Sequence, residues 1–281
     1  MEPDTRATPT APQEDAQTGD VAPTSDWQTH LGMGDAAAAL RRYKDEEAPN
    51  EEVLEALRAL SEVRFFARAK AWARARRALA QVEAPPERVA EVVDWEEVRR
   101  DIEGLETTNK HLNRRDAEAV LRGLQEVNTP LLRAEAETQR GTAHVLTGDL
   151  GRAKRAFEEA LARDPKHHRA LTNLGNVALE ENRVDDAIAA YEAALRLDES
   201  FANAHHNLGV AYRRKGHIDK SVRSIRRAQK AQRRQEAEEA RGTLSSLSGR
   251  VGRLNGRSLR YALYALGGAL LFFWLRSQGL I

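Results

Sequence analysis

Small and apolar residues recur along the second half of the chain at a fixed spacing of 34 residues. Three segments, which start at Ala134, His168 and Ala202, superimpose in register with the same residue types at the same positions. Self-similarity at a period of this size is typical of repeat proteins in which each unit is a pair of helices. The pattern therefore predicts an all-α solenoid of three helix pairs over residues 134–235.

Four positions of this unit are expected to form the contacts between its helices. Position 8 is glycine in all three copies, where one helix must approach the next too closely for a side chain. Positions 20 and 27 are small, and position 24 is large enough to fill the gap between the paired helices. The residues at positions 8, 20, 24 and 27 are Gly141, Gly175 and Gly209; Ala153, Ala187 and Ser221; Phe157, Tyr191 and Ile225; and Ala160, Ala194 and Ala228.

Turn residues separate the two helices of each predicted pair. These turn residues are Gly148-Asp149 in the first pair, Asn182 in the second and Gly216 in the third. After the second helix of the first unit, Asp164-Pro165 ends the pair, because proline cannot continue a helix and restrains the residue before it.

The middle copy carries the most complete motif, Leu171-Thr172-Asn173-Leu174-Gly175-Asn176, followed by Asp186-Ala187, Tyr191 and Ala193-Ala194-Leu195. With its two registered copies, this motif resembles the tetratricopeptide repeat family over about 100 of the 281 residues. The resemblance implies stacked helix pairs with a concave groove that binds a partner polypeptide. Thr172 stands where chaperone-binding members carry a lysine, so the resemblance does not extend to a chaperone clamp.

The resemblance also places one side of each first helix on the concave face. Positions 2, 5, 9 and 12 there offer hydrogen-bond donors, a titratable ring and cations, a mixture suited to an extended peptide or a helix. The predicted partner-binding groove consists of Arg169, Thr172, Asn176, Leu179, Asn203, His206, Val210 and Arg213. A structural role for asparagine at Asn173, Asn176 and Asn207, as is common in the family, is the alternative.

The first half of the chain divides by composition into two parts. Residues 1–35 are acidic and rich in Pro, Thr, Asp and Gln, so we expect them to be disordered. Residues 36–133 are helical in pattern, and Ala73, Ala80 and Pro85 fit positions 20, 27 and 32 of the unit. A degenerate repeat and an unrelated helical region both fit this stretch.

Two helices are better defined within 36–133. Asp94 and Glu97 form a capping motif, and the helix that follows buries a stripe made of Trp95, Val98, Ile102 and Leu105. A second helix is expected after Asp116, through Val120, Leu121, Leu124 and Val127. Asn128-Thr129-Pro130 then breaks the pattern before the first repeat.

The net charge of +1 conceals a gradient along the chain. Residues 1–133 sum to about −7, residues 134–201 to about −4 and residues 202–260 to about +11. In the last helix of the third unit, five cations at i, i+3, i+7, i+10 and i+14 share one face, opposite Val222, Ile225 and Ala228. We call these five residues the basic stripe: Lys220, Arg223, Arg227, Lys230 and Arg234.

Three interpretations of the basic stripe remain open. It is a solvated helix face, a contact for anionic lipid headgroups, or a nucleic-acid contact. No aromatic residues interleave with the cations for stacking on bases, which disfavours nucleic acid.

An uncharged run, residues 261–275, follows a basic linker at 236–260. At about 1.5 Å per residue the run spans about 22 Å as a helix, less than the roughly 30 Å hydrocarbon core. Aromatic residues near both ends and an excess of arginine before the run favour a transmembrane tail anchor with the bulk of the chain in the cytoplasm. The anchor residues are Tyr261, Leu271, Phe272, Phe273 and Trp274. A helix buried in the solenoid or across a dimer is the alternative.

Motifs for catalysis are lacking. The sequence contains no GxxxxGK[ST], HExxH or GxSxG motif and no cysteine. Adjacent histidines at 167–168 and 205–206 point about 100° apart on a helix, so we predict no metal and no cofactor. The sequence therefore predicts a membrane-tethered, non-enzymatic adaptor that binds a protein partner. The alternatives are a soluble scaffold that self-assembles through its apolar C-terminal helix and a nucleic-acid binder with a basic surface.

Overall fold

A computed structural model describes residues 26–251 of the chain, and all regular secondary structure in that range is helical. The described residues form two compact units, 26–114 with 118–136 and 115–117 with 137–251, so the division falls inside helix α8 (Arg133–Leu146). The prediction of an all-α protein is confirmed for these residues. The apolar run 261–275 lies outside them.

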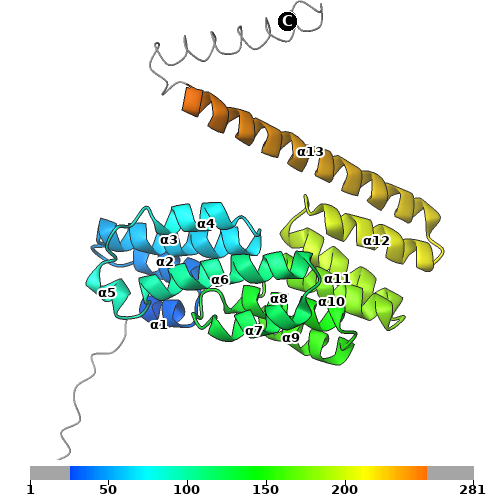
Figure 1. Ribbon diagram of the computed structural model, residues 1–281, viewed down its shortest axis with the longest axis horizontal. Helices are drawn as coiled ribbons and strands as arrows, with labels where there is room; N and C mark the ends of the chain where they lie inside the picture. The colour runs from blue at the N-terminus through cyan, green and yellow to red at the C-terminus, as the bar shows by residue number, and fades with distance from the viewer. Residues whose placement is uncertain (1–25, 252–281) are drawn as a thin grey trace, which may run out of the picture. The chain divides into compact units, whose positions relative to one another are not determined.

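The first unit is built on consecutive packing of helices, coloured blue to green in Figure 1. Helix α1 packs on α2, α2 on α3, α3 on α4, and α4 on α6. The elements are α1 (Asp26–Gly32), α2 (Ala36–Lys44), α3 (Glu51–Arg68), α4 (Trp72–Leu79), α5 (Glu87–Ala90), α6 (Trp95–Asn113), α7 (Ala117–Gly123) and the 3-10 helix η1 (Leu124–Glu126).

Helix α1 corrects the expectation that residues 1–35 are disordered. It begins at Asp26, and Trp27 and Leu31 are almost completely buried. Trp27 meets Tyr43 of α2 edge to face, with ring centroids 5.2 Å apart. Two large apolar residues four apart share one helix face, and this local pair outweighs the polar composition of the stretch. Residues 1–25 lie outside the described range.

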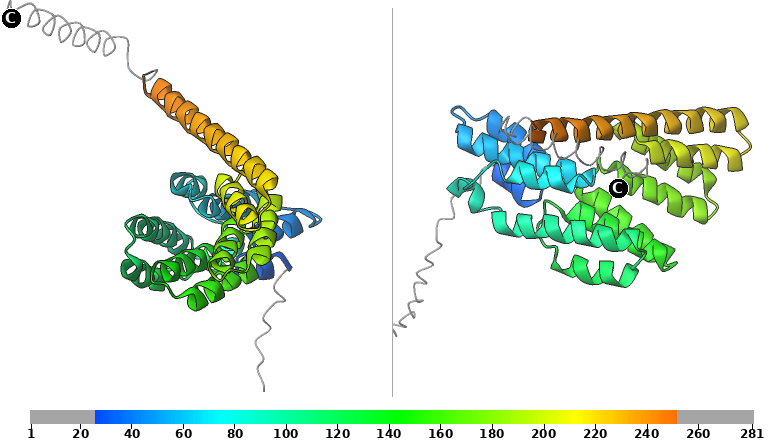
Figure 2. Two further views of the ribbon diagram at one scale, coloured as in Figure 1. Left: turned by 90° about the vertical axis from the view of Figure 1, so that its right-hand side faces the viewer. Right: turned by 45° about the horizontal axis from the view of Figure 1, so that its top comes forward.

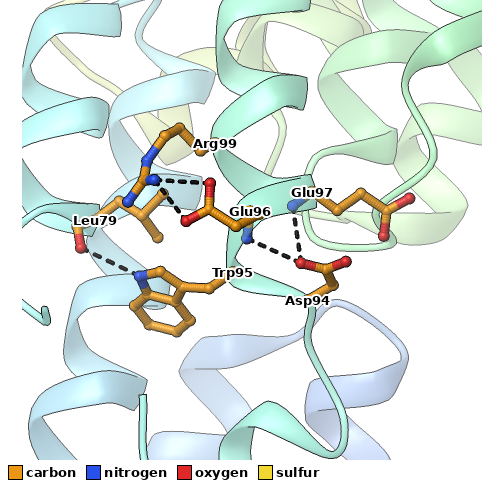
Figure 3. Close-up of polar contacts among 6 residues, drawn as sticks. All are labelled: Leu79, Asp94, Trp95, Glu96, Glu97 and Arg99. Carbon is orange, nitrogen blue, oxygen red and sulfur yellow. Dashed lines mark hydrogen bonds and ion pairs between the residues drawn. The ribbon is translucent and has the colours of Figure 1, made fainter. Parts of the chain in front are cut away.

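The start of α6 confirms the predicted cap and stripe. Figure 3 shows Asp94 Oδ1 accepting hydrogen bonds from the backbone N–H groups of Glu96, at 2.9 Å, and Glu97, at 3.0 Å. The Trp95 indole N–H donates to the carbonyl of Leu79, the last residue of α4, at 3.4 Å. The four predicted stripe residues of α6 are all buried. The tryptophan thus joins the end of one helix to the start of another.

The second unit continues the consecutive packing. Its helices after α8 are α9 (Leu150–Arg163), α10 (His168–Glu180), α11 (Val184–Leu197), α12 (Ala202–Arg214) and α13 (Ile218–Val251). Helix α9 packs on α10, α10 on α11, α11 on α12 and α12 on α13. Figure 2 shows α13 continuing well past the end of α12. Residues 236–251, which we predicted to be linker, therefore belong to α13.

The side of α13 that packs inward differs in part from the prediction. Ser221, Ser224 and Ala228 are buried, and Ile225 is half-buried. Val222, which we expected to face the stack, is 44% exposed. The hydroxyl of Ser221 donates to the carbonyl of Gly209 at 2.7 Å, so a small polar residue takes the inward position.

The predicted close approach at position 8 is confirmed, and the group that lies against each glycine is the large side chain at position 24. A Cβ atom built on Gly141 would lie 2.4 Å from Phe157, one on Gly175 would lie 2.5 Å from Tyr191, and one on Gly209 would lie 2.7 Å from Ile225. Distances this short leave no room for a methyl group, so these glycines set the spacing of each helix pair.

Identical turns connect six helix pairs along the described chain. In each, the first helix ends two residues before a residue with φ between 56° and 83°, and the next helix begins two residues after it. These residues are Gly34, Lys70, Arg115, Gly148, Asn182 and Gly216. In the α10–α11 turn, Asn182 N–H donates to the Leu179 carbonyl and Arg183 N–H to the Ala178 carbonyl, the pattern of a Schellman motif.

The turns at Lys70 and Arg115 were not recognisable as such in the sequence. Lys70 occupies the left-handed position after α3, where the repeats have glycine or asparagine. The burial pattern of α4 also differs from the predicted register, because Ala73 and Ala80 are exposed while Ala75 and Leu79 are buried. The first unit is thus built of helix pairs, with a different set of core positions from those we predicted.

Candidate partner-binding surfaces

The predicted groove residues divide into surface and interior. Asn203, His206 and Arg213 on α12 are exposed, and Arg169 and Val210 are partly exposed. Asn176, also a predicted groove residue, is partly exposed as well.

Thr172 and Leu179 on α10 are corrections to the predicted groove. Thr172 is 3% exposed, and its hydroxyl donates to the carbonyl of His168 at 2.9 Å. Leu179 belongs to an apolar cluster with Tyr191 and Leu208. Both positions lie on the seam where neighbouring helices pack, so they offer no surface to a partner.

Asparagine side chains link successive first helices. Asn173 Nδ2 donates to Thr142 Oγ1 at 3.4 Å, and one unit later Asn207 Nδ2 donates to Asn176 Oδ1 at 2.7 Å. The buried Tyr191 hydroxyl donates to the same oxygen at 2.8 Å, and burial raises the pKa of this tyrosine. Asn176 therefore ties α10 to α11 and α12, which supports the structural alternative for this predicted groove residue.

The first pair of adjacent histidines is held by local contacts. His167 precedes α10 and accepts from the Ala170 N–H through Nδ1 at 3.2 Å, with its Nε2 3.4 Å from Thr138 Oγ1. The His168 ring lies edge to face on Phe201, with centroids 4.7 Å apart. Within the described part of the chain, no three His, Asp or Glu side chains gather as metal ligands would.

The basic stripe lines two cavities in the second unit. The larger, about 350 Å³, is formed by α11, α12 and α13 and is lined by Lys220, Arg223 and Arg227 among others. The second, about 300 Å³, is lined by Arg227, Lys230 and Arg234. Glu199, His205 and Arg227 line both cavities. We call the two together the basic groove, with the walls Glu192, Leu195, Arg196, Glu199, Ser200, His205, Leu208, Tyr212, Ser224, Ala231 and the five stripe residues.

The cations of the stripe have no ion-pair partners among the described residues. Elsewhere in the same unit, cations are paired: Arg183 bonds Asp186, and Lys215 bonds Asp185. In the basic groove, Lys220 lies over the ring of Tyr212, 5.4 Å from its centroid. Burial and a hydrogen bond to Glu192 raise the pKa of Tyr212 to about 12, so this hydroxyl stays neutral. The groove therefore carries more cations than carboxylates, and Glu192 and Glu199 are the acidic residues that line it.

His205 is the functional candidate that the sequence did not reveal. It is 5% exposed, and its Nε2 lies 2.9 Å from the carbonyl oxygen of Glu199. Its Nδ1 is buried without a hydrogen-bond partner among the described residues. His205 stands where the tetratricopeptide repeat family often has a large apolar residue, and that departure is the signal in the sequence.

Comparison with known proteins identifies the class of the repeats. Residues 138–200 and 172–237 match the tetratricopeptide repeat family. This match agrees with the resemblance in the sequence and with the helix pairs of the second unit.

Individual relatives are similar over part of the chain or in fold. The peroxisomal targeting signal receptors of Komagataella phaffii and Komagataella pastoris are each 38% identical over 68 residues, which is 24% of this chain and 12% of the receptor. MamA is 19% identical with a TM-score of 0.40, covering 75% of this chain and 97% of its own. YrrB, described as a TPR protein with an unusual peptide-binding site, is 16% identical with a TM-score of 0.38, covering 71% and 93%.

The predicted membrane anchor lies outside the described range, including Tyr261, Leu271, Phe272, Phe273 and Trp274. In residues 26–251, no helix combines the length and the apolar character needed to cross a bilayer.

Proposed function

We propose that this chain is an adaptor that binds a partner polypeptide on the exposed side of α10 and α12. The observation that carries the proposal is the match of residues 138–237 to tetratricopeptide repeats. A relative that is 38% identical over 68 residues is named a peroxisomal targeting signal receptor. The matched part is 12% of that receptor, so the partner of this chain is left to experiment.

The available surface suits an extended peptide. Asn203 and Arg213 are donors and His206 adds a titratable ring, while Val210 gives a partly exposed apolar contact. The hydrogen bond from Asn207 to Asn176 fixes α12 against α10, so the surface is formed before a partner arrives. A preformed surface lowers the ordering cost of binding.

A charge-reversal comparison tests this surface. Full-length chain with Asn203→Ala and Arg213→Glu is used as bait in proximity labelling, beside a control with Gln229→Ala and Arg226→Glu on the exposed side of α13. The two variants have the same charge change and lose one amide each. We expect partners to be lost from the first variant and kept by the control. Partners that are kept by both variants would place binding elsewhere.

We further propose that the segment 261–275 tethers the adaptor to a membrane, with the bulk of the chain in the cytoplasm. Its support is the uncharged sequence bracketed by Arg260 and Arg276. Tethering would raise the local concentration of whatever the α10–α12 surface binds. Membrane pelleting that resists carbonate and disappears on deletion of residues 257–281 is the expected result. A full-length chain that stays soluble as an oligomer would instead support self-assembly through this segment.

A further inference from the structure

We propose that the basic groove is a second binding site, and that it takes an acidic segment of a polypeptide. This site goes beyond the proposed function, which places a partner on α10 and α12. The two sites use different residues. His205 and His206 are neighbours on α12, but the first lines the basic groove and the second is exposed with the predicted α10–α12 surface.

Unpaired positive charge identifies an anionic occupant. Lys220 and Arg234 are 14 positions apart, so the stripe extends about 21 Å along α13. No carboxylate of the described residues pairs with any of the five cations, which therefore repel one another until an anion binds. An extended peptide of about six residues covers the same length.

The walls of the basic groove favour a polypeptide over other anions. The recess is lined by three helices and includes the side chains of Leu195 and Leu208, which suit apolar side chains between acidic ones. Glu192 and Glu199 also line it, and carboxylates can accept from the backbone N–H groups that a peptide carries. Lipid headgroups on a flat bilayer would contact the rim of α13 and leave the recess unfilled. Bases need open aromatic faces, and Lys220 already covers the ring of Tyr212.

His205 lines both cavities of the basic groove and has one ring nitrogen without a hydrogen-bond partner among the described residues. The Glu199 carbonyl oxygen can only accept, so Nε2 of His205 carries a hydrogen and donates it to this oxygen. The unpartnered nitrogen is Nδ1, which is buried. Buried polar atoms are nearly always paired in folded proteins. Less than 1 Å² of this Nδ1 atom is accessible, so a donor on a bound peptide reaches it only when the His205 ring or its neighbours move.

Fluorescence anisotropy tests the site with the full-length chain in mild non-ionic detergent. The probe is a fluorescein-labelled peptide of five Asp-Glu-Leu triplets, and five Asn-Gln-Leu triplets form the neutral probe. Arg223→Glu with Arg227→Glu reverses two cations of the basic groove. The matched control is Arg226→Glu with Arg233→Glu, on the same helix but lining neither cavity. Circular dichroism verifies that both variants keep the helical content of the parent chain.

We expect the acidic probe to bind the parent chain, and the groove variant to bind it at least about tenfold more weakly. The control should change the affinity by less than about threefold, and the neutral probe should bind much more weakly than the acidic one. Hydrogen exchange should slow in α11 and α12 as well as α13 when the acidic probe binds. Equal losses in both variants would refute the site. Absence of peptide binding, with stripe-dependent flotation on phosphatidylserine vesicles or binding of single-stranded DNA, would refute the polypeptide as occupant.

Discussion

Replacement of Gly175 by alanine is expected to destabilise the second unit through a single contact. The added Cβ would lie 2.5 Å from Cε1 of Tyr191 and 2.8 Å from its Cδ1. The Tyr191 ring cannot move aside freely, because it is fully buried and its hydroxyl is hydrogen-bonded to Asn176. The helix pair must therefore separate, or the ring must leave its preferred position.

Two opposing contributions set the size of the effect. Alanine is more favourable than glycine inside a helix by about 1 kcal/mol. Overpacking of a filled core costs about 1–3 kcal/mol, and the enclosed ring places this site near the upper end. The net expectation is a loss of about 2 kcal/mol from the free energy of unfolding. At about 2–4 °C per kcal/mol for a domain of this size, the midpoint falls by about 4–8 °C.

Gly151 of α9 provides the matched control. Its substituted Cβ would have Asp149 Oδ1 as nearest neighbour, at 3.7 Å, so the same glycine-to-alanine change meets no obstacle there. We expect Gly151→Ala to be neutral or to stabilise by up to about 1 kcal/mol. Urea unfolding followed by circular dichroism at 222 nm measures both variants against the parent chain.

A Gly175→Ala variant as stable as Gly151→Ala would contradict the reasoning. A double-mutant cycle with Tyr191→Leu adds a second criterion, because residues in contact should not behave additively. The alanine at position 175 should cost at least about 1 kcal/mol less when the ring is absent. Additive losses would mean that the contact with Tyr191 does not set the helix spacing.

Three further outcomes follow from the turns and caps. Gly34→Ala should be severely destabilising in thermal melts, because φ is +83° and the Cβ would lie 2.4 Å from the carbonyl oxygen of Pro130, a backbone atom that cannot rotate away. Gly148→Ala should cost about 1–2 kcal/mol from backbone strain alone, since no atom lies within 4 Å of its Cβ. Arg115→Gly, at φ +59°, should instead stabilise the protein by about 0.5–1 kcal/mol. Urea unfolding should therefore give changes of opposite sign in the free energy of unfolding for these two variants. Asp94→Ala should cost about 1 kcal/mol by removing the α6 cap, and Asp94→Asn should retain most of it in the same assay.

The repeat region was largely predictable because its packing depends on residues that are close in sequence and recur in every unit. Glycine at position 8 and a bulky residue at position 24 recur in register, and the structure brings each pair into contact. The α6 cap was predictable for the same reason, since Asp94 bonds residues two and three positions further on. The turns at Lys70 and Arg115 could not be found this way, because residues with a Cβ atom rarely adopt positive φ.

The candidate sites were predictable in composition but not in arrangement. The spacing of the stripe places five cations on one face of a helix, whatever lies opposite them. That Glu199 and His205 share two cavities with those cations depends on how α11 and α12 pack against α13. Likewise, Thr172 and Leu179 fall on the expected helix yet are buried by neighbouring helices.

The sequence by itself determined the period, the helix pairs and the glycine contacts, because each depends on residues within one 34-residue unit. Only the tertiary structure decided that Asn176 joins three helices and that the Nδ1 atom of His205 is buried without a donor. Those features arise where side chains from separate helices meet. The free energy of such contacts depends on burial and on the partners present, and neither is encoded in the spacing of residues along one helix.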